Sequence, residues 1–196
     1  MKKFVAVFDA DGVLLRSTRP ANYLEQRYGL SCEKMAPFLA EIGGCLIGQV
    51  DMKTILPDYL ERWGVGQSVD EFLAEAFNSG CEIDPEVVEM IGALRKRGIT
   101  CCLATNQDRH RIAFLDQHLN IRAHFDRCFV SCEMGVKKPN HGFYHAIAEV
   151  FPHANFVFWD DSSANVEAAC ECSWTAFVYT GPAQMRNEIA QRTSQR

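Results

Sequence analysis

Residues 4–12 of the chain read FVAVFDADG, and this stretch decides the fold. Its first five residues are apolar and rich in β-branched and aromatic side chains, which is typical of a buried strand. Asp9 and Asp11 follow at once, and Gly12 indicates a turn. Two carboxylates at the end of a buried strand are costly unless a cation meets them there. The stretch therefore predicts a strand that opens onto a divalent metal site, although an ordinary Asp-Gly turn fits the same residues.

The composition is that of a globular protein with one domain of ordinary size. The chain has 196 residues, of which 47% are hydrophobic and 23% are charged. A net charge of -5 and the lack of a basic cluster argue against nucleic acid or an anionic membrane as a partner. No apolar stretch reaches the roughly 20 residues of a membrane span. Asp9 and Asp11 also interrupt the N-terminal apolar run before it reaches signal-peptide length. We expect a cytoplasmic protein that is a monomer or a weak homodimer.

The nine cysteines are expected to be reduced thiols. Their number is odd, and no Cys-x-x-Cys pair occurs in the chain. Cys101, Cys102 and Cys128 fall in expected strands, where a free cysteine behaves as a small apolar residue. The closely spaced pairs do not have the usual spacing of zinc ligands. The sequence therefore favours a reducing compartment over a disulfide framework.

Residues 17–80 predict a block of helices separated by Gly, Pro and Ser. In residues 52–63 the apolar side chains recur at intervals of three and four, which gives that helix one apolar face. The block interrupts the chain after the first strand and before an α/β pattern begins. It therefore predicts a small inserted α-helical cap domain, residues 17–80, on a core domain formed by residues 1–16 and 81–196. The expected helices span residues 22–28, 33–42, 52–63 and 69–77.

From residue 84 onward, expected helices and strands alternate. Asp84-Pro85-Glu86 has the capping residue, the proline and the acid that mark the start of a helix. Alternating strands and helices need right-handed crossovers, and they form a parallel sheet with helices on both faces. The sequence therefore predicts an α/β fold with a Rossmann-like, doubly wound parallel sheet. The expected order is helix 85–97, strand 99–104, a helix ending near 119, strand 127–131, helix 140–150, strand 155–159, helix 163–172 and strand 175–179. Residues 181–196 are expected to be a loop with a short helix, or a loose tail.

Polar side chains follow each of the first four expected strands. In open α/β sheets, ligands bind outside the carboxyl ends of the strands. Each polar group has an ordinary alternative as a turn residue, a surface charge or a helix cap, but chance would scatter such groups over both edges of the sheet. Their common placement predicts one polar site. The groups are Asp9 and Asp11, then Thr105 and Asn106, then Lys138, and finally Asp160 and Asp161.

These segments resemble, in order, the four motifs of the haloacid dehalogenase superfamily of phosphotransferases. The resemblance spans essentially residues 1–180, and the helical block is similar to the smaller cap type of that superfamily. It implies a Rossmann-like core and phosphoryl transfer through an aspartyl-phosphate, with Mg²⁺ as the cofactor. The matching segments are FDADGVL at 8–14, LATN at 103–106, GVKKP at 135–139 and DDSSAN at 160–165.

The acidic residues can be given physical roles that agree with the resemblance. Asp9 would attack phosphorus and form the aspartyl-phosphate, which splits one difficult displacement into two easier ones. Asp11 would protonate the leaving alcohol and later activate water. Mg²⁺ prefers carboxylate and water oxygens. Asp9, the backbone carbonyl of Asp11, and Asp161 would hold the ion, with Asp160 assisting.

The other motif residues are expected to bind the phosphoryl group. The Thr105 hydroxyl and the Lys138 ammonium would hold its oxygens and offset the charge of the transition state, with Asn106 beside them. Lys137 is a rival for this role. The superfamily motif uses the lysine immediately before proline, and this favours Lys138.

The leading interpretation is a Mg²⁺-dependent phosphatase that hydrolyses a small phosphorylated metabolite. Residues 48–64 resemble the cap segment of bacterial sugar-phosphate phosphatases, which suggests a sugar phosphate. A phosphomutase of the β-phosphoglucomutase type is the alternative, because it shares both aspartates and the small cap. A noncatalytic binding module with this fold would have lost an essential group, and none is missing. A dehalogenase needs no second aspartate and no Mg²⁺, so Asp11 and Asp161 argue against one.

Specificity is expected to come from the cap, because the core motifs touch only the phosphoryl group and the metal. We expect the loop of residues 43–49 to close over the substrate, with Gln49 or Lys53 as polar contacts. The two crossings between core and cap, at Arg16-Ser17 and at residues 79–81, include small residues that could serve as hinges.

Overall fold

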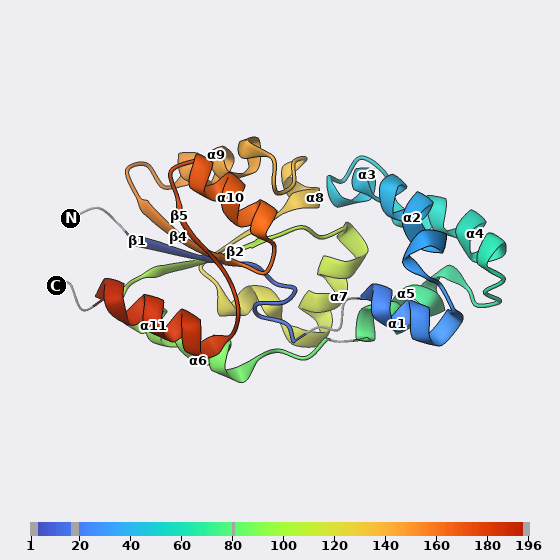
Figure 1. The fold of residues 1–196 in the computed structure, drawn as a ribbon, viewed down its shortest axis with the longest axis horizontal. Helices are drawn as coiled ribbons and strands as arrows, with labels where there is room; N and C mark the ends of the chain where they lie inside the picture. The colour runs from blue at the N-terminus through green and yellow to red at the C-terminus, as the bar shows by residue number, and fades with distance from the viewer. Residues whose placement is uncertain (1–3, 17–19, 80, 194–196) are drawn as a thin grey trace.

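The computed structural model describes residues 4–16, 20–79 and 81–193 (Figure 1). Its centre is a sheet of five parallel strands in the order β3-β2-β1-β4-β5. The N-terminal apolar run forms the central strand, with residues 5–8 fully buried. The doubly wound α/β fold expected from the sequence is confirmed. The strands are β1 (Phe4–Phe8), β2 (Thr100–Thr105), β3 (Arg127–Val130), β4 (Asn155–Asp160) and β5 (Thr175–Val178).

Helices cover both faces of the sheet (Figure 1). Val5 and Val7 point to one face, where they pack with α9 (His141–Val150) and α10 (Ser163–Glu171). Ala6 and Phe8 point to the other face, because successive side chains of a strand alternate. That second face is covered by α6 (Pro85–Lys96), α7 (Arg109–Leu119) and α11 (Pro182–Thr193), and the short elements η1 (Ile121–His124) and α8 (Ser131–Met134) complete the core.

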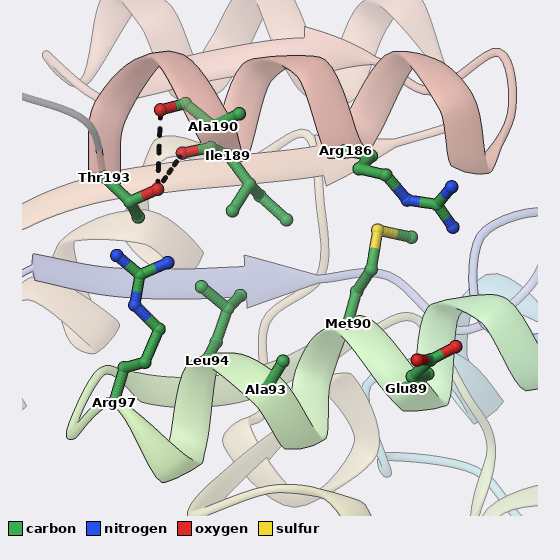
Figure 2. A pocket seen from close by; sticks show the side chains of 9 residues that line it. All are labelled: Glu89, Met90, Ala93, Leu94, Arg97, Arg186, Ile189, Ala190 and Thr193. Carbon is green, nitrogen blue, oxygen red and sulfur yellow. Dashed lines mark hydrogen bonds between the residues drawn. The ribbon is translucent and has the colours of Figure 1, made fainter.

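The C-terminal segment is more regular than the loop with a short helix, or loose tail, that was expected. Helix α11 has 12 residues and packs against α6. Met185 is fully buried, and the indole Nε1 of Trp159 donates a hydrogen bond of 2.6 Å to Glu188. Among the described residues of α11, Met185 alone is buried, which is a weak indication of a packed helix. The polar composition of this segment therefore suggested a tail. A pocket of about 490 Å³ lies between α6 and α11, and none of the motif residues line it. Figure 2 shows the side chains that line this pocket.

Residues 20–79, here called the helical insert, lie beyond the carboxyl ends of the strands (Figure 1). They have an apolar cluster of their own, in which Leu56 and Met35 are almost fully buried. The loop that was expected at residues 43–49 contains one short helix. The insert consists of α1 (Pro20–Tyr28), α2 (Cys32–Glu41), α3 (Gly43–Leu46), α4 (Met52–Trp63) and α5 (Val69–Asn78).

The two chain segments that connect the core to the insert are fastened to each other. The guanidinium of Arg16 donates two hydrogen bonds to Asp84, at 3.0 and 3.1 Å. The backbone N–H of Asp84 donates to the carbonyl of Leu14 at 2.8 Å. The expected hinge residues Ser17 and Gly80 lie outside the described residues.

The insert also touches the core at α7 and α8. Asp51 Oδ1 lies 2.6 Å from His110 Nε2, and the Arg109 guanidinium donates a 3.1 Å hydrogen bond to the carbonyl of Gly48. Gly48 has φ +73°, and a Cβ at this position would lie 2.2 Å from the Cys132 carbonyl oxygen. Only glycine therefore allows this close approach.

All nine cysteines are free thiols. None of the helices in the described parts of the chain is both long and apolar enough to span a membrane.

Candidate active site

Asp9 lies at the carboxyl end of the central strand and is 7% exposed. Its Oδ1 accepts a 2.7 Å hydrogen bond from the backbone N–H of Ala10, and Lys138 Nζ is 3.0 Å from the same oxygen. Burial is the main reason that the pKa of Asp9 is raised to about 7. The negative charges of Asp160 and Asp11 also raise this pKa, whereas the positive charge of Lys138 lowers it. In the absence of a further cation, burial therefore favours the protonated form of this carboxyl more than it is favoured in an exposed aspartate.

Lys138 connects two acidic strand ends. Its side chain is almost fully buried, and Nζ lies 2.5 Å from Asp160 Oδ2 as well as 3.0 Å from Asp9 Oδ1. Burial alone would lower the pKa of Lys138, but the charges of Asp9 and Asp160 outweigh burial and raise its pKa above the ordinary lysine value. The ammonium therefore stays charged between two buried carboxylates.

The side chain of Asn106, which was expected to help bind the phosphoryl group, contacts the backbone of Lys138. Its Nδ2 donates to the carbonyl of Lys138 at 2.9 Å, and its Oδ1 accepts from the backbone N–H of Lys138 at 2.9 Å. Because both ends of the amide are engaged, Asn106 positions the backbone that carries the buried lysine.

Three carboxylates converge at the edge of the sheet. One oxygen each from Asp9, Asp160 and Asp161 lies within 4.8 Å of the other two. Asp160 is fully buried, and its Oδ1 also accepts hydrogen bonds of 2.9 Å from the Ser162 backbone and the Asn165 amide. Clustered hard oxygen ligands are the donor set that Mg²⁺ prefers. The residues present therefore fit this ion.

Gly12 makes room for one of these carboxylates. Its φ is +77°, and a Cβ at this position would lie 2.6 Å from Asp161 Oδ2. Any larger residue would meet both a strained backbone and the Asp161 side chain. The glycine of the first motif therefore allows the turn after β1 to lie against the side chain of Asp161.

Asp11 is held by two residues that the sequence analysis missed. Gln107 Nε2 donates to Asp11 Oδ2 at 2.6 Å and lies 3.2 Å from the Thr105 hydroxyl. Arg111 Nη2 donates to Asp11 Oδ1 at 2.7 Å. One feature of the sequence could have indicated Arg111. It lies four residues before Leu115 and therefore on the apolar face of the helix that follows the second motif, where a charged residue is unusual.

Arg111 has a further unusual feature. Its side chain is buried, yet its Nη1 has no hydrogen-bond partner among the described residues. A buried donor without a protein partner is normally satisfied by water or by a ligand.

These groups surround a cavity of about 500 Å³ between the core and the insert. Of the predicted site residues, Asp160 is fully buried beneath the cavity and the others of the four motifs line it. The described core residues that line the cavity are all polar, and the described insert residues that line it are all apolar. The lining core residues are Asp9, Asp11, Thr105, Asn106, Gln107, Asp108, Arg111, Lys138, Asp161 and Asn165.

The two residues expected to confer specificity do not line this cavity. Gln49 is exposed. Lys53 is directed to α5, where its Nζ lies 2.6 Å from Asp70 on the outer surface of the insert. Their polarity suggested a substrate contact. Lys53 instead lies on the polar, solvent-facing side of the amphipathic helix α4, and Gln49 lies in the exposed bend before that helix.

The fold and the site define a Rossmann-like α/β protein with a carboxylate and lysine centre at the carboxyl edge of its sheet. The chain belongs to the haloacid dehalogenase-like hydrolases, whose family model matches residues 5–171. Bifunctional epoxide hydrolase 2 of Rattus norvegicus is 25% identical over 213 residues, covering 96% of this chain and 38% of that protein. The chain thus spans less than half the length of this curated relative.

Solved structures share the fold. The haloacid dehalogenase family enzyme bt-2542 of Bacteroides thetaiotaomicron, in complex with magnesium and inorganic phosphate, matches with a TM-score of 0.73 at 18% identity, covering 91% of this chain and 94% of that one. L-2-haloacid dehalogenase of Xanthobacter autotrophicus, with chloropropionic acid covalently bound, matches with a TM-score of 0.64 at 19% identity, covering 90% and 76%.

Proposed function

We propose that the chain is a Mg²⁺-dependent phosphatase that hydrolyses phosphate monoesters through an aspartyl-phosphate on Asp9, with the helical insert as its cap. The observation that carries the proposal is the buried ammonium of Lys138 between Asp9 and Asp160, at the base of a ligand-sized cavity. A buried cation beside a carboxylate nucleophile suits an anionic substrate, because it offsets the repulsion between two negative groups. The solved bt-2542 complex, which contains magnesium and phosphate, is consistent with this chemistry.

The first step uses Asp9 as the nucleophile. The Ala10 N–H and Lys138 orient its carboxylate, and the Thr105 hydroxyl faces the same cavity. Attack on phosphorus forms the bond from the Asp9 oxygen to phosphorus as the ester bond breaks. Asp9, Asp160 and Asp161 would hold Mg²⁺. When bound, the ion supplies positive charge that offsets the charge of the phosphoryl oxygens.

The proton transfers are assigned to Asp11. It lines the cavity two residues from the nucleophile, so it can protonate the departing alcohol oxygen and later take a proton from the attacking water. Gln107 and Arg111 each engage one carboxylate oxygen, and together they fix its orientation. Both are therefore positioning residues for Asp11.

Replacing Arg111 with methionine is expected to lower kcat by roughly 10- to 100-fold, because a small misplacement of a catalytic group is costly. The change removes the 2.7 Å contact to Asp11 but keeps the length of the side chain. Steady-state kinetics on p-nitrophenyl phosphate would separate kcat from KM, with circular dichroism as a check on folding. Arg127→Met, an exposed change on β3, is the control and should leave both constants unaltered. A folded Arg111→Met protein with wild-type kcat would contradict the positioning role.

The overall proposal is tested with p-nitrophenyl phosphate in Mg²⁺ and in EDTA. We expect release of p-nitrophenol in Mg²⁺, its loss in EDTA, and its recovery when Mg²⁺ is restored. No release by folded, metal-loaded protein from this ester or from a broad panel of phosphorylated metabolites would refute the proposal. Conversion of a hexose 1-phosphate to the 6-phosphate, without free phosphate, would indicate a mutase instead.

A further inference from the structure

The cavity above the acidic cluster has two chemically different walls. Its core wall is polar and holds the groups assigned to the phosphoryl group and its transfer. Its opposite wall comes from the insert, and each described insert residue that lines it is apolar. That wall includes Met35, Phe38, Leu39, Met52, Phe72 and Phe77. With the phosphoryl group at the core wall, the part of a substrate that leaves with the ester oxygen would face this second wall.

Two groups of polar side chains in the insert contact each other and not the cavity. The carboxylate of Glu75 accepts hydrogen bonds from the Tyr28 hydroxyl at 2.6 Å and from Gln67 at 2.9 Å. Glu41 accepts from the Tyr59 hydroxyl at 2.7 Å. None of these groups lines the cavity, so the described part of the insert offers a substrate hydrocarbon contacts without hydrogen-bond partners.

We propose that the natural substrate is a phosphate monoester whose leaving group is a hydrocarbon chain or ring, and not a sugar. This inference rests on the proposed phosphatase function. The hydroxyls of a sugar would lose water at the insert wall and find no partner there, which is unfavourable. A methylene group at the same wall loses only unfavourable contact with water.

The first experiment compares ethyl, butyl, hexyl and octyl phosphate with glucose 6-phosphate in Mg²⁺. We expect kcat/KM to rise about fourfold for each added methylene until the wall is covered, which corresponds to ~0.8 kcal/mol per methylene. Hexyl phosphate should exceed glucose 6-phosphate by at least roughly 10-fold. The inference would be overturned if kcat/KM did not change with alkyl chain length, or if kcat/KM for glucose 6-phosphate equalled that for hexyl phosphate.

A binding measurement separates this inference from the proposed function. Alkylphosphonates of the same chain lengths are titrated into the protein with Mg²⁺ in a calorimeter, and we expect Kd to fall with chain length whether or not esters are hydrolysed. If p-nitrophenyl phosphate is not turned over while Kd still falls, the phosphatase proposal fails and the apolar subsite stands. If p-nitrophenyl phosphate is turned over and Kd does not change with the chain length of the alkylphosphonate, the subsite is refuted.

A pair of variants locates the subsite. Leu39 lines the cavity, and because it is 46% exposed, Leu39→Gln adds a polar group there with little effect on folding. Val50 is 36% exposed in the same insert and does not line the cavity, so Val50→Gln is the matched control. Leu39→Gln should lower the ratio of kcat/KM for octyl phosphate to that for ethyl phosphate at least about fivefold, whereas Val50→Gln should change it less than about twofold. Equal effects of the two variants would refute the placement.

Discussion

Asp9→Asn is expected to abolish turnover, lowering kcat roughly 10⁴-fold or more, because the amide has nearly the same volume but is not a nucleophile. Binding of phosphate should survive, since Lys138 and the backbone around residue 9 are unchanged. Single-turnover and steady-state assays in Mg²⁺ would measure the loss. Asp58→Asn, a change at an exposed carboxylate of α4, is the control and should retain full activity. More than a trace of turnover in Asp9→Asn would contradict the covalent mechanism.

The same substitution is expected to stabilise the metal-free protein. The pKa of Asp9 is about 7 in the folded chain, against an ordinary value of 3.8, because burial opposes ionisation. At pH values between these two pKa values, Asp9 is protonated in the folded state and ionised in the unfolded state. The free energy of unfolding of the wild type therefore decreases as pH rises from about 4 to 7. Asparagine removes this dependence, so the advantage of the variant should grow with pH.

Urea unfolding in EDTA at two pH values would test this difference. The free energy of unfolding of Asp9→Asn should gain on the wild type by about 2.5 kcal/mol between pH 5 and pH 8, at ~1.4 kcal/mol for each pH unit below the folded pKa. Asp58→Asn should gain nothing. A constant difference between the variant and the wild type at all pH values would show that Asp9 is ionised in the metal-free fold.

Lys138→Met is expected to have the second largest effect, because it acts on both activity and folding. Asp9 and Asp160 would remain buried without the ammonium that lies 3.0 and 2.5 Å from them. Breaking a buried ion pair from one side typically costs about 3–5 kcal/mol, since an uncompensated charge stays in the interior. Turnover should fall below detection, since the charge opposite the phosphoryl group is lost.

Unfolding in urea, with and without Mg²⁺, would measure how much Lys138→Met lowers the free energy of unfolding. Mg²⁺ should recover part of the stability, since it would bind the carboxylates that have lost their partner. The double variant with Asp9→Asn should also recover part of the loss, which keeps the test informative if the single variant folds poorly. Lys137→Met is the matched control, because its side chain is not buried beside the carboxylates. Equal losses from Lys137→Met and Lys138→Met would contradict the assignment.

The fold and the polar edge of the sheet were predictable because their signals are local. Each buried strand is an apolar run, and the rule that ligands bind at carboxyl strand ends then brings Asp9, Lys138 and Asp161 together from distant parts of the chain. Gln107 and Arg111 were missed because their contacts with Asp11 join residues 96 and 100 positions apart. No local pattern encodes such a pairing.

The wall of the insert was missed for a different reason. Phe38 and Phe72 belong to the apolar cluster of the insert and also line the cavity. In the sequence, an apolar side chain on an amphipathic helix has the same pattern whether it packs inside a domain or faces a ligand. The sequence pattern therefore indicated the polar residues Gln49 and Lys53 as substrate contacts, and both are exposed.

The bond between Arg16 and Asp84 also limits how the insert can move. Because the two connecting segments are joined at the core boundary, we expect a rigid displacement of the insert to be a swing about this junction and not a sideways slide. The contacts of Asp51 with His110 and of Gly48 with Arg109 lie away from this junction. Both are partly exposed, so each is expected to contribute about 1 kcal/mol or less to stability. A swing that breaks these contacts and separates Phe77 of the insert from Phe114 of α7 would widen the cavity on the side away from the Arg16–Asp84 junction.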